Sequence, residues 1–146
     1  MARQLITFQL GAQSFGFDIL AIREIRAWTP TTRLPHVPDY VKGVVNLRGT
    51  VLPVLDLAAR LGWNGVTPTE RHVIIVTEVD GQLRGLIVDS VSDIVTIENE
   101  DIQPSTNNIN ETVARCLEGL VAIEERMVMV LDLSGLMSDV GDLKAA

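Results

Sequence analysis

Residues Val41–Asp56 read VKGVVNLRGTVLPVLD, and this stretch decides how the chain is expected to fold. Two short apolar runs, Val44–Leu47 and Val51–Leu55, flank an Arg-Gly-Thr sequence. Gly49 can adopt the positive φ that a tight turn between two strands requires. We therefore predict a β-hairpin with Arg48 at its tip and with the apolar side chains of both strands directed toward a core.

The second half of this stretch carries two further signals. Pro53 has no N–H to donate to a neighbouring strand, which predicts that its strand lies at a sheet edge or at a bulge. Asp56 directly precedes Leu-Ala-Ala-Arg-Leu, so its carboxylate is expected to cap a short helix at 57–61. A charged tip backed by apolar strands indicates a surface presented to a partner and not a catalytic site.

The composition argues against several classes of protein. The 146 residues suffice for one compact core or two small ones, and a hydrophobic fraction of 47% is ordinary for a globular chain. The net charge is −7 and the 12 basic residues are scattered, whereas nucleic acids and anionic membranes are bound by clustered Lys and Arg. We expect no nucleic-acid partner and, without an apolar run of about 18–20 residues, no membrane insertion.

The ends and the cysteine content predict a cytoplasmic protein. The chain starts MARQLITFQL, which passes directly into alternating apolar residues and has no apolar signal core. Its single cysteine, Cys116, cannot form an internal disulfide and fits a reducing compartment.

The order of motifs in the first half of the chain recurs in the second half. The segment GFDILAIREI at 16–25 resembles GLIVDSVSDI at 85–94. Two glycine–aspartate pairs also have the same spacing: Gly43 with Asp56, and Gly119 with Asp132. These matches predict an internal duplication. The alternative is chance, since short apolar strands resemble one another.

The repeat predicts an all-β domain that spans 1–146, with copies at about 1–66 and 67–146. Each copy has about five short strands, a few short helices join them, and terminal strands can be exchanged between the copies. Strands this short expose unpaired edges unless the sheet closes on itself. We therefore expect two small β-barrels, packed side by side over a shared apolar seam.

Candidate catalytic and metal-ligating residues are few. His36 and His72 have no His or Cys at metal-ligand spacing, which favours surface roles for both. Asp56, Asp89 and Asp132 end apolar runs; three carboxylates raise the possibility of a metal or acid–base site. Capping of the following turns, at about 0.5–2 kcal/mol each, is the favoured role. We expect no enzyme, no cofactor and no metal.

Glu24 and Arg48 are the charged residues that could meet if the first copy closes as a barrel. The alternative is two solvated charges, whose interaction contributes less than about 1 kcal/mol. The second copy has Asp93 and Glu124-Glu125 at the matching positions and so lacks an opposite-charge pair. This asymmetry predicts that the two copies serve different partners.

Motifs along the whole chain resemble those of the CheW-type coupling proteins of bacterial chemotaxis. They are FGFDILAIREI at 15–25, RLPHVPDYVKGVVNLRGTVLPVLDL at 33–57, GLIVDSVSDI at 85–94 and MVMVLDL at 127–133. The resemblance implies two SH3-like five-stranded barrels that form a scaffold between transmembrane chemoreceptors and a CheA-type histidine kinase. It implies no catalytic activity and a place at receptor arrays on the membrane.

The resemblance also implies residue roles. The receptor tip docks in the groove between the barrels, at positions matching Ile22, Glu24 and Arg48. The regulatory domain of the kinase docks on a barrel edge near Lys42 and Gly43. Two further glycines match family positions with tight backbone geometry: Gly85 and Gly119.

The chain departs from the family at the last hairpin, where Glu124-Glu125-Arg126 replaces a glycine-bearing turn. It also lacks a receiver or phosphotransfer segment. Two alternatives stay open from the residues alone. One is an adaptor of another array, which governs pilus motility or a different output. The other, less favoured, is a small β-barrel that binds a metal or ligand through its Asp residues.

Overall fold

The computed structural model describes residues 2–62, 68–104 and 116–134. Within these residues, the named elements are ten strands, two single turns of 3-10 helix and the short helix α1. In chain order these are β1 (Ala2–Leu10), β2 (Gln13–Asp18), η1 (Ile19–Ala21), β3 (Ile22–Ala27), β4 (Val41–Leu47), β5 (Thr50–Asp56), α1 (Leu57–Arg60), β6 (Val73–Val79), β7 (Gln82–Val88), β8 (Ser90–Glu98), η2 (Asn99–Asp101), β9 (Leu117–Ile123) and β10 (Arg126–Leu131).

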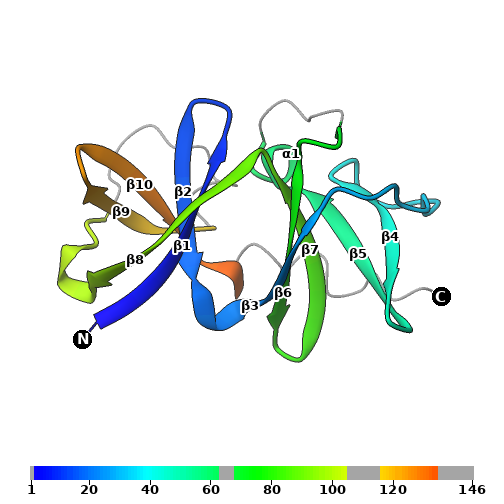
Figure 1. Cartoon of the computed structure of the whole chain (residues 1–146), viewed down its shortest axis with the longest axis horizontal. Helices are drawn as coiled ribbons and strands as arrows, with labels where there is room; N and C mark the ends of the chain where they lie inside the picture. The colour runs from blue at the N-terminus through cyan, green and yellow to red at the C-terminus, as the bar shows by residue number, and fades with distance from the viewer. Residues whose placement is uncertain (1, 63–67, 105–115, 135–146) are drawn as a thin grey trace.

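The strands form two five-stranded sheets, which lie side by side in Figure 1. Subdomain A has the strand order β8-β1-β2-β10-β9, and subdomain B has the order β3-β6-β7-β5-β4. Each combines antiparallel hairpins with one parallel pairing, β2 with β10 and β5 with β7. The prediction of an all-β chain with two SH3-like five-stranded subdomains is confirmed.

The two sheets have the same strand order when β1–β5 are matched with β6–β10 in sequence. Each sheet combines one two-stranded hairpin from one half of the chain with three strands from the other half. The halves 1–66 and 67–146 are therefore interleaved and do not correspond one to one to the subdomains. The duplication itself stays a prediction.

A shared apolar core joins the subdomains. Three phenylalanines of β1 and β2 (Phe8, Phe15 and Phe17) are fully buried there, and the ring of Phe8 packs on the other two with centroids 5.9 and 5.5 Å away. The same cluster contains Leu55 of β5 and Leu86 of β7. Because this core draws on both sheets, the subdomains are expected to unfold together. Each sheet also has a smaller cluster of its own.

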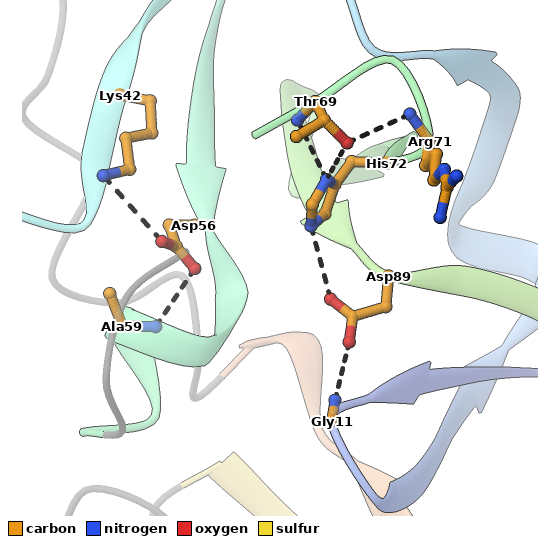
Figure 2. Close-up of polar contacts among 8 residues, drawn as sticks. All are labelled: Gly11, Lys42, Asp56, Ala59, Thr69, Arg71, His72 and Asp89. Carbon is orange, nitrogen blue, oxygen red and sulfur yellow. Dashed lines mark hydrogen bonds and ion pairs between the residues drawn. The ribbon is translucent and has the colours of Figure 1, made fainter. Parts of the chain in front are cut away.

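Asp89 links the subdomains where the chain passes from β7 to β8. Its Oδ2 accepts a hydrogen bond from the backbone N of Gly11 at 2.7 Å, in the β1–β2 turn. Its Oδ1 lies 3.5 Å from Nε2 of His72, whose Nδ1 accepts a bond from the backbone N of Thr69 at 3.0 Å (Figure 2). The prediction that Asp89 caps the following turn is wrong, and so is a surface role for His72, whose side chain is 16% exposed.

β5 is an interior strand, so of the two predicted explanations for Pro53, a sheet edge or a bulge, the sheet edge is wrong. β5 lies between β4 and β7. The parallel ladder with β7 begins only at Val54, one residue after the proline. Pro53 is therefore tolerated because it lies outside the ladder with β7, where no hydrogen bond requires the N–H that proline lacks. A bulge does occur nearby, on β4, where Lys42 is the extra residue between Val41 and Gly43.

Three hairpins turn through two residues with positive φ, which matches the right-handed twist of the flanking strands. At the β4–β5 turn these are Arg48 (φ 50°) and Gly49 (φ 87°). At the β9–β10 turn they are Glu124 (φ 48°) and Glu125 (φ 69°), neither of which is glycine. The second turn therefore holds two side chains in a conformation that costs roughly 1–2 kcal/mol per residue.

We predict that Glu125→Gly raises the free energy of unfolding by about 1 kcal/mol, because glycine adopts this φ without steric strain. The reciprocal change Gly49→Ala should lower it by a similar amount, since a Cβ there meets no atom within 4 Å and only the φ is unfavourable. Urea unfolding measures both. Glu125→Gln is the control for loss of charge alone, and an equal gain from that variant would contradict the conformational explanation.

Candidate docking surfaces

The tip of the β4–β5 hairpin carries a charged cluster. Nη2 of Arg48 donates to Oε1 of Glu24 at 2.5 Å, and Nη1 of Arg26 donates to Oε2 of the same carboxylate at 3.2 Å. Glu24 and Arg48 are thus paired and not separately solvated. The side chain of Arg48 is 77% exposed and that of Glu24 is 24% exposed, so the guanidinium is presented outward with the carboxylate beneath it.

Local backbone geometry positions this cluster. Oδ1 of Asn46 accepts a hydrogen bond from the backbone N of Gly49 at 2.9 Å, which fixes the turn beside Arg48. On β3 the register shifts between Ile22 and Glu24, and such bulges re-aim side chains. Ile22 is partly buried against the shared core. The hairpin tip and β3 therefore hold the ion pair on a rigid base.

The guanidinium groups control the charge of Glu24. The hydrogen bond from Arg48 is the main reason that the pKa of Glu24 lies below its usual value; Arg26 lowers this pKa further, and partial desolvation opposes both. Glu24 therefore stays ionised to more acidic pH than a free glutamate.

A hollow of about 290 Å³ opens beside the ion pair in subdomain B. Its apolar wall is formed by Leu47, Leu52, Val76 and Leu83, and its charged rim by Arg23, Glu24, Arg48 and Glu78. Nε of Arg23 donates to Oε1 of Glu78, which forms a second ion pair on this rim.

A second hollow, of about 330 Å³, lies between the subdomains. It is lined by apolar residues of both, including Phe17, Leu20, Val79 and Leu131. Leu20 is 85% exposed there. Glu24 and Arg48 do not line this groove, but Glu78 borders both hollows, so the groove and the hairpin tip form neighbouring parts of one face.

Lys42 lies at the other end of β4, on the bulge. Its Nζ is 3.9 Å from Oδ2 of Asp56, a fully buried carboxylate whose Oδ1 accepts a hydrogen bond from the backbone N of Ala59 at 3.2 Å (Figure 2). Asp56 thus caps α1 and also faces a lysine. The cap could be predicted because Asp56 directly precedes the helix in sequence. The contact with Lys42 could not, because Lys42 is distant in sequence and reaches Asp56 through the pairing of β4 with β5.

Gly43 and Gly119 lie where a loop crosses a strand. A Cβ on Gly43 (φ 145°) would stand 2.3 Å from the backbone O of Thr32, and one on Gly119 would stand 2.6 Å from the O of Gln103. Any side chain at either position would displace the crossing loop. Gly85 is also crowded, since a Cβ there would stand 2.9 Å from Cγ2 of Ile74. In the second half, Oδ1 of Asp132 accepts a bond from the backbone N of Ser134.

In the described part of the chain, no three His, Cys, Asp or Glu residues are grouped closely enough to hold a metal ion. None of the helices in residues 2–62, 68–104 and 116–134 is long and apolar enough to cross a membrane.

A family model described as the CheW-like domain matches residues 4–141. The chain belongs to the CheW-like family. It is 48% identical over 137 residues to the probable chemotaxis protein CheW of Rhizobium etli, covering 94% of this chain and 88% of that protein. It is 50% identical over 131 residues to the chemotaxis protein CheW of Rhizobium meliloti, covering 90% and 84%.

The fold of this CheW-like chain matches a solved structure as well. The crystal structure of the scaffolding protein TtCheW from Thermoanaerobacter tengcongensis superimposes with a TM-score of 0.83 at 30% identity, over 94% of this chain and 88% of that chain. The family assignment therefore rests on sequence and on structure over nearly the whole length.

We predict that Arg48→Gln raises the pKa of Glu24 toward its usual value, because the main group that stabilises the carboxylate is removed. Arg26→Gln should raise it less. The Glu24 pairing stabilises the fold above the unfolded-state pKa, and this stabilisation is lost as pH falls through the lower folded-state pKa. A carboxyl-detected NMR titration of Glu24 measures the shift. An unchanged pKa in Arg48→Gln would contradict the pairing.

Proposed function

We propose that this CheW-like chain is a non-enzymatic chemotaxis scaffold, which couples the cytoplasmic tip of chemoreceptors to the regulatory domain of a CheA-type histidine kinase. The observation that carries the proposal is that β4 joins the family's kinase-docking positions to Arg48, one of its receptor-docking positions. Lys42 and Gly43 lie near its start and Arg48 follows its end. At about 3.3 Å per residue, these positions are about 20 Å apart along one strand. A single rigid element would thus fix the distance between two partners, in the cytoplasm at the receptor array.

In this proposal the receptor docks on the face that contains Ile22, Glu24 and Arg48. Arg48 is exposed and held by Glu24, so its guanidinium is preorganised and loses little side-chain entropy on binding. The neighbouring groove between the subdomains supplies apolar surface, including the exposed Leu20. Apolar contact with a charged rim is the usual composition of a specific protein interface.

The kinase docks, in this proposal, at the other end of β4. This strand is the last in the order of subdomain B, and among the described residues its outer side is met by the bridge from Thr32 to Val44 and the hydrogen bond from Thr31 to Lys42. An edge of this kind can pair with a related fold by main-chain complementarity. Lys42 is a contact residue, whereas Gly43 acts by allowing the Thr32 crossing.

Arg48→Glu tests the receptor contact. We predict that it abolishes co-sedimentation with receptor-containing membranes and receptor-dependent kinase activation, because a carboxylate is then presented next to Glu24 where a guanidinium stood. The thermal unfolding midpoint should change by only a few degrees, since the side chain is mostly exposed. The matched control is Arg71→Glu, at an exposed arginine that lines neither of the two hollows on the receptor face. Normal receptor-dependent kinase activation by Arg48→Glu would contradict the assignment of Arg48 to the receptor contact.

Lys42→Gln tests the kinase contact. We expect weaker binding of the purified regulatory domain in a pull-down, with receptor co-sedimentation retained. Glutamine is chosen because glutamate would direct a second carboxylate toward the buried Asp56, which Lys42 now faces, and destabilise the fold by charge repulsion. Binding equal to that of the unmodified chain would remove Lys42 from the kinase surface.

A further inference from the structure

A hollow of about 540 Å³ lies between the proline-rich segment after β3 and the start of β4. Its apolar part comes from an indole, three aliphatic side chains and three prolines; these are Trp28, Leu34, Val37, Val41, Pro30, Pro38 and Pro68. Its polar part comes from Thr31, Arg33, His36, Asp39 and Lys42. This volume is within the range of sites that bury a large side chain or a small ligand.

The walls of this hollow are held in place before any partner binds. Thr32 and Val44 exchange two backbone hydrogen bonds, of 2.9 and 2.8 Å, and Oγ1 of Thr31 donates to the carbonyl O of Lys42 at 3.0 Å. At the other end of the segment, the backbone N of Val41 donates to the O of Pro38 at 2.9 Å. The prolines further restrict φ. A hollow with such walls loses little conformational entropy when it is filled.

The rim is locally basic, although the chain carries a net charge of −7. Arg33 and Lys42 are cationic, His36 is titratable, and Asp39 is the one carboxylate among the lining residues. Arg33 is exposed and makes no hydrogen bond or ion pair through its side chain with another residue of the described ranges. It is therefore available to an acidic group from outside, while Lys42 already faces Asp56.

The two positions that the family resemblance assigns to kinase docking both converge on this hollow. Lys42 lines it directly. Gly43 does not line it, but the absence of a Cβ at Gly43 lets Thr31 and Thr32 cross β4, and Thr31 lines the hollow. The hollow is thus continuous with the proposed kinase surface and lies at the opposite end of β4 from Arg48.

We propose that this hollow is an anchor site for the kinase regulatory domain, which inserts a bulky apolar side chain from an acidic segment. The apolar side chain lies against Trp28 and Leu34, and a neighbouring carboxylate pairs with Arg33. The inference rests on the proposed kinase docking and adds to it the chemistry of the segment that is bound. An apolar anchor beside an arginine is a frequent source of interface affinity.

The test is calorimetric titration of the full-length chain with the purified regulatory domain of its CheA-type kinase. Arg33→Glu and Leu34→Asp should each weaken binding by at least about tenfold, the size of a typical hot-spot loss. Raising the salt concentration should weaken binding of the unmodified chain more than that of Arg33→Gln, because an exposed ion pair is screened. Arg71→Glu, at an exposed arginine that does not line this hollow, is the control and should bind normally.

The outcomes distinguish failure of kinase binding as a whole from failure of the anchor site alone. If the unmodified chain does not bind the regulatory domain, the proposed kinase coupling itself fails. If it binds, and Arg33→Glu and Leu34→Asp bind equally well, the kinase docks elsewhere and the anchor site is overturned. If Arg33→Glu loses binding and Leu34→Asp does not, the proposed ion pair is supported and the proposed insertion of an apolar side chain is rejected. Leu34→Ser replaces Leu34→Asp if circular dichroism shows that the latter unfolds.

Discussion

The structure depends on burial of one apolar core between two sheets that each take strands from both halves of the chain. Neither half forms its own sheet, because β1 and β2 pair with β8 and β10, and β6 and β7 pair with β3 and β5. Small barrels of this size bury too little surface to be stable alone. Interleaving the halves makes the relative position of the subdomains part of the fold, which is the property a scaffold between two partners needs.

β4 connects two places at which the backbone conformation is locally constrained. At its start, the Gly43 crossing and the bulge at Lys42 set the shape of the edge. At its end, the turn at Arg48 and Gly49 sets where a guanidinium is presented. Neither constraint relies on a flexible loop. Movement of one end relative to the other would therefore require disruption of the β4–β5 ladder, so the spacing between the two ends is fixed by the fold.

Local features of the fold could be predicted from the sequence, and long-range contacts could not. The hairpin turn at Gly49 and the cap from Asp56 depend on residues within three positions of each other. The bond from Gly11 to Asp89 joins residues 78 positions apart, and no periodicity in the sequence reports it. Pro53 shows the same limit of local prediction. The missing N–H of proline excludes a ladder hydrogen bond from that residue, but the rest of β5 can still lie inside the sheet.

The two subdomains also present one turn geometry with different charges. The β4–β5 and β9–β10 turns have nearly the same φ values, yet one carries Arg48-Gly49 and the other Glu124-Glu125. Apolar residues are exposed at matching places, with Val51 after the first turn and Met127 after the second. Because the backbone geometry and the exposed apolar residues are alike, the two tips differ mainly in the charge of their turn residues. Opposite charges on two similar tips disfavour a common partner, which is the physical basis for the prediction that the two subdomains serve different partners.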